Sequence, residues 1–220
     1  MNKQNNIPEI VLVGGGGHAK VVIDTIHKNG DYKIKGIIEK SADVSGLFNY
    51  PVLGNDDKLN EVYAAGCKNA FIAIGSIGDP SHRVKLYEKL KQIGFALPVI
   101  VHPAAVIAEG AVIEEGSFIA AGAVIGPDAK IGKNVIINTN TSVDHDCIIG
   151  DHIHMAPGVT LSAGVEIGHH AHIGTGSSVI QYRKIGAGTL IGAGSIVVKD
   201  IPEKVKAYGN PCRVMGDHNV

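Results

Sequence analysis

The chain has 220 residues, a formal net charge of −1 at pH 7, and 29 Ile and 23 Val against 9 Leu. Because β-branched residues lose side-chain freedom in helices and pack well on pleated surfaces, this balance argues against a helical bundle. A hydrophobic content of 45% argues against a disordered chain. Near-neutral charge without a local cluster of Lys and Arg gives no electrostatic footprint for nucleic acid, so no nucleic-acid partner is expected.

The N-terminal residues and the cysteines predict a location. Residues 1–9 are mostly polar and lack the apolar stretch of a signal peptide. The most apolar window, residues 95–113, is interrupted by prolines and by Glu109, so no membrane insertion is expected. Cys67, Cys147 and Cys212 are odd in number and far apart, which suits reduced thiols. The sequence therefore predicts a cytoplasmic protein.

Residues 1–98 alternate strand and helix patterns, which predicts a Rossmann-like parallel sheet. The expected elements in chain order are a strand over Glu9–Val13, a glycine turn, a helix over His18–Asn29, a strand over Lys33–Ile38, a short helix capped by Asn55, a strand over Asn69–Gly75, and a helix from Asp79–Pro80 to Gly94. Seven of the nine Leu precede residue 98, where these helices lie.

The motif Gly14-x-Gly16-x-x-Ala19 follows a strand and opens a helix. Glycines let the backbone approach a phosphate, and a helix N-terminus attracts an anion, so a phosphate-bearing ligand is favoured over a simple tight turn. NAD is not expected, because a domain this short is half of a dinucleotide fold. The residues predicted to face the ligand share one edge of the sheet: Gly17, His18, Glu39, Lys40 and Gly75.

A repeat of six residues begins at Val101. Its first positions are all Ile, Val, Leu or Met: Val101, Ile107, Ile113, Ile119, Ile125, Ile131, Ile137, Val143, Ile149, Met155, Leu161, Ile167, Ile173, Val179, Ile185, Ile191 and Val197. The fifth position is usually small, as at Ala123 and Ser177. Period six fits neither one helix nor one long strand. The repeat predicts a parallel β-helix in which each coil pairs with its neighbours around a continuous aliphatic core.

Histidines interrupt this repeat. His145 is the third residue of its hexad, a position that points outward or lies at a corner, and the neighbouring Asp146 could hold its ring ready as a base. If a coil has eighteen residues, two pairs stack: His152 on His170, and His154 on His172. Zinc binding is the competing use of these imidazoles. A plain surface position is favoured for these histidines: His27, His82, His152, His169, His170 and His218.

Three features together carry a resemblance to a family. They are a Gly-Gly-His strand–turn–helix module, hexads with Asn-Thr…His-Asp…Ile-Gly…His, and a Gly-x-Pro-x-Arg at residues 209–213. Over about residues 9–215 the chain resembles the bacterial nucleotide-sugar acetyltransferases that make N-acetylated bacillosamine and perosamine, and the related sialic acid O-acetyltransferases. The resemblance implies α/β plus all-β architecture: a Rossmann-like nucleotide-sugar-binding domain over 1–98, then a left-handed parallel β-helix acetyltransferase domain with a C-terminal tail over 99–220. It also implies a homotrimer.

The resemblance assigns roles to single residues. His145 falls on the catalytic base of the family and Asp146 on the acid that orients it. Asn138 falls on a substrate-side Asn, and His154 on the histidine that contacts acetyl-CoA near the thioester. Acetyl-CoA is implied to lie along the groove between the β-helices of the trimer.

Eighteen-residue spacing adds to this for the cofactor. Thr175 and Ala193 should form one axial column with Pro157, and His145 should form another with Ala163. An extended pantetheine arm parallel to the axis would meet both columns. The predicted acetyl-CoA-binding residues are His154, Ala163, Gly164, Thr175 and Ala193.

Some residues depart from the family pattern. Ala163 stands where a Gly is common, and Cys212 stands where Ala is usual. The hexad over residues 179–184 breaks the small-residue pattern. Its Arg183 and Lys184 either meet the phosphates of CoA or belong to an outward loop, and the loop is the simpler interpretation.

The predicted function is acetyl transfer from acetyl-CoA to the amino group of a nucleotide-linked sugar, most simply a 4-amino-4,6-dideoxy sugar, in surface glycan or glycoprotein biosynthesis. His145 would take the amine proton, while a backbone N–H with His154 nearby would stabilise the oxyanion. The alternatives are an O-acetyltransferase acting on sialic acid or another sugar, a zinc enzyme like the γ-class carbonic anhydrases, and a non-enzymatic sugar-nucleotide-binding module. No metal is expected. UDP, GDP and dTDP all stay open as the nucleotide.

Overall fold

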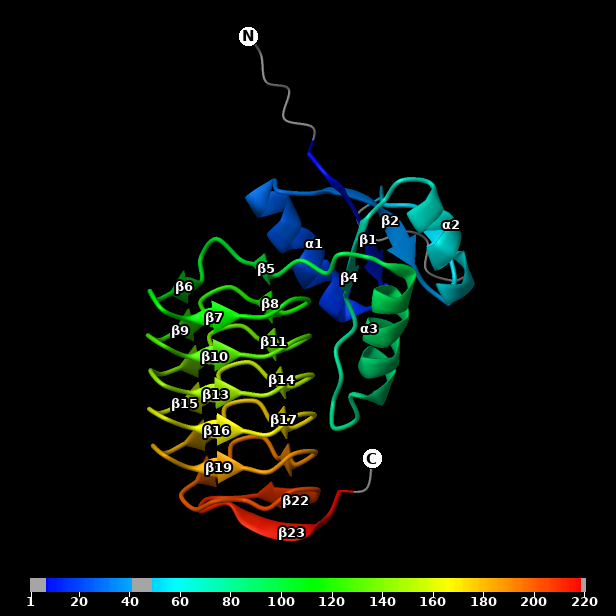
Figure 1. Ribbon diagram of the computed structural model, residues 1–220. Helices are drawn as coiled ribbons and strands as arrows, with labels where there is room; N and C mark the ends of the chain where they lie inside the picture. Colours follow the sequence, from blue (N-terminus) through cyan, green and yellow to red (C-terminus); the bar gives the residue numbers. More distant parts are fainter. Residues whose placement is uncertain (1–6, 41–48, 219–220) are drawn as a thin grey trace.

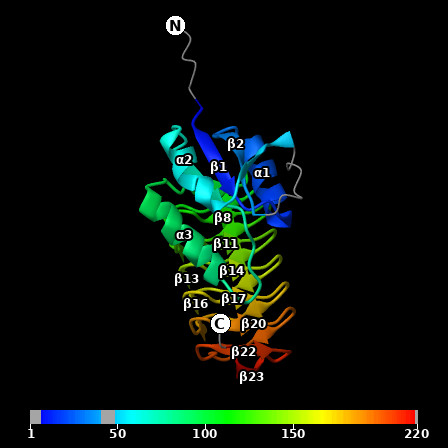
Figure 2. The same ribbon diagram turned by 90° about the vertical axis from the view of Figure 1, so that its right-hand side faces the viewer.

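The computed structural model describes residues 7–40 and 49–218. Figure 1 shows two parts: an α/β module at the N-terminal end, and a column of stacked coils that continues to the C-terminal end. Figures 1 and 2 agree that the last helix of the module runs alongside the upper and middle coils. No helix in the described ranges is long and apolar enough to cross a membrane.

The N-terminal module contains one parallel sheet, sheet A, with the strand order β3-β2-β1-β4. Its strands are β1 (Glu9–Val13), β2 (Lys33–Ile38), β3 (Val52–Gly54) and β4 (Asn69–Ile72). Its helices are α1 (Gly17–Asn29), α2 (Leu59–Ala64) and α3 (Ser81–Ile93), with a 3₁₀ turn, η2 (Asp56–Lys58), before α2.

The predicted starts and stops of these elements are largely confirmed. β1 and β2 have the predicted bounds, and Asn55 caps η2 by accepting a hydrogen bond from the Asp57 N–H. α1 and α3 end where Gly30 and Gly94 adopt φ values of 70° and 102°, a left-handed conformation that glycine accepts without strain.

Two expectations about sheet A were wrong. β4 ends at Ile72 rather than Gly75, because the chain turns away after Ala73 donates to Val13 O. The strand β3 was missed. It has three residues and pairs irregularly with β2, so it carries too few positions to show an alternating pattern.

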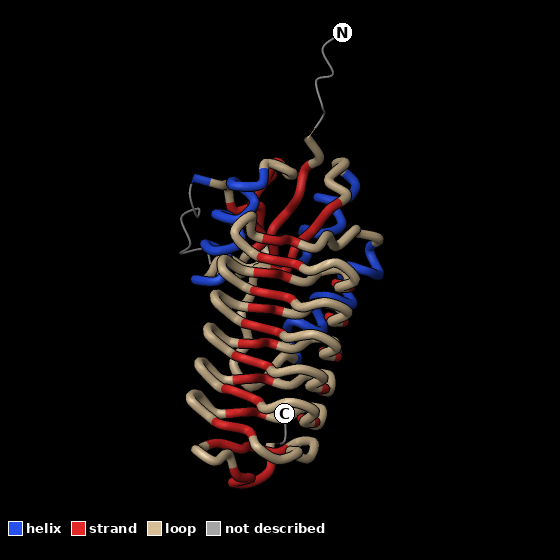
Figure 3. Tube along the Cα trace, turned by 90° about the vertical axis from the view of Figure 1, so that its left-hand side faces the viewer, coloured by secondary structure: helices blue, strands red, loops and turns tan. Residues whose placement is uncertain are grey.

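The coils form three sheets along the column (Figure 3), parallel as predicted for a β-helix except for the last strand of sheet B, which runs antiparallel to its neighbour. Sheet B contains β5 (Ile100–Val101), β8 (Phe118–Ile119), β11 (Ile136–Ile137), β14 (His154–Met155), β17 (His172–Ile173), β20 (Leu190–Ile191), β22 (Val205–Tyr208) and β23 (Arg213–Asp217). Sheet C contains β6 (Val106–Ile107), β9 (Val124–Ile125), β12 (Ser142–Val143), β15 (Thr160–Leu161), β18 (Ser178–Val179) and β21 (Ile196–Val197). Sheet D contains β7 (Val112–Ile113), β10 (Lys130–Ile131), β13 (Ile148–Ile149), β16 (Glu166–Ile167) and β19 (Lys184–Ile185).

The register of the repeat is confirmed strand by strand. In β5 to β21, the second residue of each two-residue strand is the first position of a predicted hexad. Paired strands are eighteen residues apart, as in Ile136 beside His154, so three hexads make one coil of the left-handed β-helix. From β8 onward the second residues fill the core, whereas Ile107 in the first coil is exposed. The small fifth positions close the inner corners. Thr141, for example, is fully buried and its hydroxyl donates to Ala156 O.

Each coil has three corners, named here by the sheets that they join. Corner BC follows sheet B, corner CD follows sheet C, and corner DB returns to sheet B. The N-terminal module packs on sheet B, where Phe118 is fully buried against Phe71 and His18. The module and the upper part of sheet B therefore share one hydrophobic core.

Candidate active site

The glycine turn lies at the carboxyl end of β1. The Gly15 N–H donates to Glu39 Oε2 at 2.7 Å, which ties the turn to the end of β2. Gly17 is the exposed first residue of α1, and Gly16 before it offers no capping side chain. The first N–H groups of α1 therefore face open space beside a carboxylate. This combination could receive both a phosphate and a donor group of a nucleotide.

The other residues predicted in this module divide into two groups. Gly75 lies beside His18: the point where a side chain on Gly75 would begin is 3.8 Å from His18 Cβ. Lys40 is exposed, with its Nζ 3.9 Å from Asp56 Oδ2. The structure therefore gathers Gly17, His18, Glu39 and Gly75 at one edge of sheet A, with Lys40 at the rim.

His18 points down into the junction with the β-helix. Its ring stacks edge-on against Phe118 with centroids 5.3 Å apart, and its Nε2 is buried with no hydrogen-bond partner. Burial, with the nearby His154 and Arg83, lowers the pKa of His18 to about 3. The ring is therefore neutral at physiological pH.

His154 lies on β14, directly below this junction, and is 8% exposed. Its Nδ1 bonds to Ser76 O, and its Nε2 lies 3.4 Å from Asn138 Nδ2. Since a carbonyl oxygen only accepts, Nδ1 carries the hydrogen, and Nε2 of the neutral ring is an acceptor. Burial lowers the pKa of His154 to about 4 despite the Ser76 carbonyl, which acts in the opposite direction.

This tautomer bears on the role of His154. A backbone N–H with His154 nearby is expected to stabilise the oxyanion, and stabilising an oxyanion requires a donor. The neutral ring with its hydrogen on Nδ1 presents a lone pair at Nε2, so it suits an N–H or O–H group rather than a negative oxygen.

His145 and Asp146 form a pair at corner CD, below β12. His145 Nδ1 lies 2.7 Å from Asp146 Oδ2, and the two side chains are 49% and 65% exposed. The hydrogen bond to Asp146 raises the pKa of His145. A carboxylate that accepts Nδ1–H leaves the lone pair on Nε2, which is the arrangement that a general base needs.

The eighteen-residue columns are confirmed. At corner BC the Gly176 and Gly194 N–H groups donate to Pro157 O and Thr175 O, which stacks Pro157, Thr175 and Ala193. At corner CD the Gly164 N–H donates to His145 O at 3.0 Å, which stacks Ala163 below His145.

The predicted acetyl-CoA residues belong to both corners. Thr175 and Ala193 line a hollow of about 310 Å³ together with His154, His172 and Ile77. Ala163 and Gly164 lie on corner CD, and sheet C separates the two corners within one chain. One chain thus carries two half-sites: the junction half-site at corner BC with the N-terminal module, and the base half-site at corner CD.

The backbone of Gly164 already has contacts within the chain. Its N–H is used by His145 O, and a methyl group on its Cα would lie 2.6 Å from Tyr182 Cδ1. Tyr182 belongs to the irregular hexad and has φ 57°. The basic residues of that hexad face carboxylates, with Arg183 Nη1 3.5 Å from Asp200 and Lys184 Nζ 2.9 Å from Glu166.

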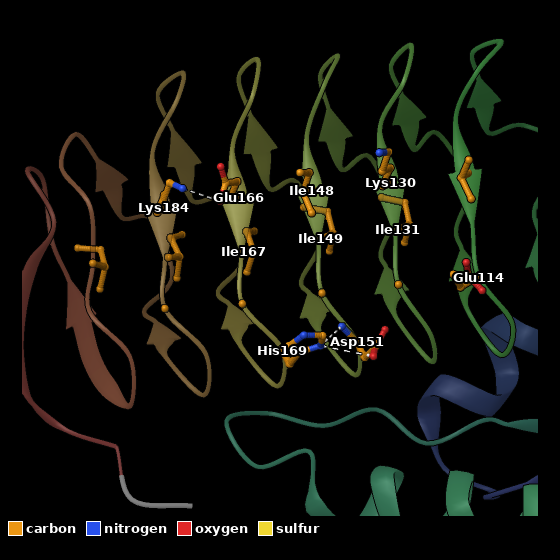
Figure 4. Close-up of a pocket in the computed structure, with 17 residues that line it drawn as sticks. Glu114, Lys130, Ile131, Ile148, Ile149, Asp151, Glu166, Ile167, His169 and Lys184 are labelled. Atoms are coloured by element: carbon orange, nitrogen blue, oxygen red, sulfur yellow. Dashed lines mark hydrogen bonds and ion pairs between the residues drawn. The ribbon is translucent and has the colours of Figure 1, made fainter.

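Another hollow, with a volume of about 630 Å³, lies along sheet D (Figure 4). A column of glycines and the ion pairs Lys184–Glu166 and His169–Asp151 line it. None of the predicted site residues faces it. Four of its charged or titratable side chains are paired with each other in these two ion pairs, unlike the exposed His145–Asp146 pair with its free Nε2.

Sequence reasoning missed a buried polar network between α3 and corner DB. Arg83 is 1% exposed and donates to Asn134, whose Nδ2 lies 3.0 Å from His152 Nδ1. Tyr87 donates to Glu115 at 2.7 Å. One signal was available. Arg83 shares the buried face of α3 with Leu86, Tyr87 and Leu90 at helical spacing, where a charged residue is unusual.

Two histidines predicted on the surface are buried. His152 is 8% exposed, packed against Tyr87 and stacked on His170 at 5.4 Å, and His218 is 8% exposed with Nδ1 bonded to Gly188 O. The stacking of His152 on His170 and of His154 on His172 is as predicted. In the described ranges, no group of three or more His, Cys, Asp or Glu within one chain is placed to hold a metal ion.

Family models match both parts of the chain. A model described as the PglD N-terminal domain matches residues 9–90, and a model of the bacterial transferase hexapeptide (six repeats) matches residues 128–163. The first range contains the glycine turn, His18 and Glu39. The second contains Asn138 and the His145–Asp146 pair.

Solved structures extend the likeness over nearly the whole chain. PerB from Caulobacter crescentus, in complex with CoA and GDP-perosamine, is 40% identical with a TM-score of 0.89, and the match covers 96% of this chain and 98% of that one. The acetyltransferase domain of PglB from Neisseria gonorrhoeae FA1090, in complex with acetyl coenzyme A, is 33% identical with a TM-score of 0.88, covering 94% and 98%. WeeI from Acinetobacter baumannii AYE is 28% identical with a TM-score of 0.83, covering 94% and 99%.

Proposed function

The chain belongs to the family of left-handed β-helix, hexapeptide-repeat sugar acetyltransferases with a PglD-type N-terminal domain, and we propose that it acetylates the amino group of a nucleotide-linked amino sugar. Acetyl-CoA supplies the acetyl group as an activated thioester. The single observation that carries the proposal is the exposed His145–Asp146 pair at 2.7 Å. It offers a base at corner CD, which also carries Ala163 and Gly164 of the expected acetyl-CoA site.

His145 removes the proton that the reaction must lose. An amine that attacks a thioester forms a C–N bond while the C–S bond breaks, and one amine proton has to leave. His145 Nε2 accepts this proton and can return it to the departing thiolate. Asp146 keeps Nδ1–H in place and stabilises the charged ring while it holds the proton.

His154 and Asn138 orient the acceptor amine. Neutral His154 accepts one N–H of the amine at Nε2, which directs the nitrogen lone pair toward the thioester carbon. The donors to the developing oxyanion are then backbone N–H groups of the β-helix rather than His154. At the far end of the substrate, the glycine turn and the first N–H groups of α1 hold the diphosphate, and Glu39 faces the nucleotide.

We propose that the two half-sites join between copies of the chain in a homotrimer. Because the half-sites flank sheet C, three copies with sheet C facing a common axis bring corner CD of one copy against corner BC of the next. The outward residues of sheet C support this packing because none is charged: Val106, Val124, Ser142, Thr160, Ser178 and Ile196. Sheet D carries Lys130, Glu166 and Lys184 and would face solvent.

A matched pair of substitutions tests this packing. Thr160→Arg puts a charge on sheet C and should give monomers by light scattering, with acetyl transfer lost. Ile148→Arg puts the same charge on sheet D, beside Glu166, and should leave both the oligomer and the activity unchanged. A trimer that survives Thr160→Arg with full activity would exclude sheet C as the interface.

Subunit complementation tests the shared site. His145→Ala and His154→Ala chains are each expected to be nearly inactive as homotrimers. Mixed trimers formed by joint refolding or co-expression should regain activity, because some sites pair an intact corner CD with an intact corner BC. Activity that stays absent in verified mixed trimers would place the whole site within one chain.

An acetyl-CoA assay across UDP-, GDP- and dTDP-linked 4-amino sugars, with sialic acid as the O-acetylation control, tests the reaction itself. Turnover with one or more amino sugars and none with sialic acid is expected. Transfer to sialic acid alone would establish the O-acetyltransferase, and no consumption of acetyl-CoA with any acceptor would favour the binding module. The three cysteines are buried and unpaired, which supports the cytoplasmic location expected from the sequence.

A further inference from the structure

Arg83 is a buried cation without a carboxylate partner among the described residues. It lies in the first turn of α3, is 1% exposed, and takes part in none of the ion pairs among the described residues. Its Nε has no partner. Burial lowers the pKa of Arg83 to about 9, so the guanidinium still carries its charge at neutral pH. A buried charge without a counter-ion is costly, so its hydrogen bonds should serve a purpose.

Those hydrogen bonds join the two parts of the molecule. Nη2 donates to Asn134 O and Oδ1 at corner DB, and Nη1 donates to Ser76 Oγ at 3.3 Å on the segment that connects β4 to α3. Ser76 O in turn accepts from His154 Nδ1. One guanidinium therefore fixes the segment whose carbonyl decides which nitrogen of His154 holds the hydrogen.

The charge of Arg83 acts in the same direction. The groups that face His154 are His18 from α1, Arg83 from α3 and His172 from β17, and none of them is acidic. Burial is the main cause of the lowered pKa of His154, and the charges of His172 and Arg83 add to it. A second proton on the ring would be buried beside the charged guanidinium with no acidic partner, so the ring stays neutral.

Resting on the proposed function, we infer that Arg83 is a positioning residue of the acetyl-transfer site: through Ser76 it holds His154 as a neutral hydrogen-bond acceptor for the sugar amine. The hydrogen bonds fix the Nδ1–H tautomer, and the charge of Arg83 adds to the burial that keeps the ring neutral. Arg83 does not touch the substrate; it acts through His154.

Two substitutions separate the hydrogen bonds from the charge. Arg83→Met removes both, and Arg83→Lys keeps the charge but loses the two-armed contact with Ser76 and Asn134. Lys85→Met, two residues along the same helix and exposed, is the matched control. The full-length protein is labelled with ¹⁵N and ¹³C histidine, and the His154 signal is assigned by its absence in His154→Gln. Its tautomer and pKa are read by NMR between pH 3.5 and 8.

We expect the wild type and Lys85→Met to show Nδ1–H and no titration of His154 above pH 5. Arg83→Met should populate the Nε2–H form and raise the pKa of His154 only slightly, because burial is the main cause of the low pKa and remains. We expect kcat at pH 7.5 to fall about tenfold and KM for acetyl-CoA to change less than threefold. In Arg83→Lys, His154 should keep its low pKa but populate both the Nδ1–H and the Nε2–H tautomers. If Arg83→Met does not fold, Arg83→Lys and Ser76→Ala decide through the tautomer signal.

An unchanged His154 tautomer and pKa in the folded variants would overturn the inference and leave Arg83 a structural residue. The NMR readout requires no turnover, so it stands apart from the proposed function. Shifts in His154 without acetyl transfer by the wild type would refute the reaction and keep the positioning. Acetyl transfer by the wild type, with a His154 signal that does not change in the variants, would support the reaction and refute the positioning role of Arg83.

Discussion

The two histidines of the proposed reaction lie in opposite surroundings. His145, at corner CD, is half exposed beside a carboxylate, and its pKa is raised. His154, at the junction, is 8% exposed among a guanidinium and other imidazoles, and its pKa is lowered to about 4. The same side chain is therefore a base in one half-site and a neutral acceptor in the other. Surroundings that move two titratable groups apart are what acid–base division of labour requires.

The largest expected effect is on the base. His145→Ala should reduce kcat by about 10²–10⁴-fold, since general base catalysis contributes that much, while KM for acetyl-CoA changes little. The control is His169→Ala, which removes another exposed imidazole beside a carboxylate, Asp151, on sheet D's side of the molecule. Steady-state assays of both variants should show a loss in the first alone. Near-normal turnover in His145→Ala would end the assignment.

Asp146→Asn should have a smaller effect with a distinctive pH signature. We expect a loss in kcat of about tenfold or more, because the ring loses its orienting acceptor. The base must be unprotonated, so activity rises as pH passes the pKa of His145. Asp146 raises that pKa, so its removal should move the acidic limb of the kcat–pH profile to lower pH. A limb that stays in place would separate Asp146 from His145.

The buried histidine should show itself in stability. An unfolded chain binds a proton at His154 below about pH 6.5, while the folded chain stays neutral down to about pH 4. Stability due to this group is therefore present above pH 6.5 and is lost as pH falls toward 4, by up to about 3 kcal/mol. Urea unfolding at pH 7.5 and 5 should show a steeper decrease in the wild type than in His154→Gln. Parallel decreases would contradict the low pKa.

The smallest effect on activity is expected at Tyr182, which lies two coils beyond the His145–Asp146 corner in the C-terminal direction. A tyrosine at φ 57° is strained, so Tyr182→Gly should raise stability by about 1 kcal/mol or less and leave kcat within about twofold. Gly164→Ala is the opposing test, because its new methyl group meets the Tyr182 ring. Differential scanning calorimetry should show opposite shifts in Tm. A tenfold change in kcat for Tyr182→Gly would place this ring in the reaction.

The repeat could be predicted closely because its information is local. Whether Ile137 or Met155 points inward depends on position within the hexad alone, and every two-residue strand from β5 to β21 fell in register. The His145–Asp146 pair was predictable for the same reason, since adjacent residues at one corner must lie close together.

The junction could not be predicted in this way. His152 is buried because Tyr87, far away in sequence, covers it, and Arg83 is buried because α3 lies against corner DB. The tautomer of His154 depends on a carbonyl at Ser76. The separation of the half-sites follows from which corners carry them, and a period of six does not identify the face that meets another copy. These facts need the three-dimensional contacts.

The corner residues have one more consequence. Asp128 and Asp146 occupy equivalent positions in successive coils, and both adopt left-handed φ values, 57° and 60°. That conformation favours Gly, Asn and Asp, so the geometry of the turn alone already recruits a carboxylate to this place. A catalytic acid could therefore arise there from a residue first selected for its backbone. Pro127 precedes Asp128 as His145 precedes Asp146, so a histidine at position 127 would place the same pair one coil nearer the N-terminus. Equivalent corners of successive coils could therefore carry the same catalytic pair.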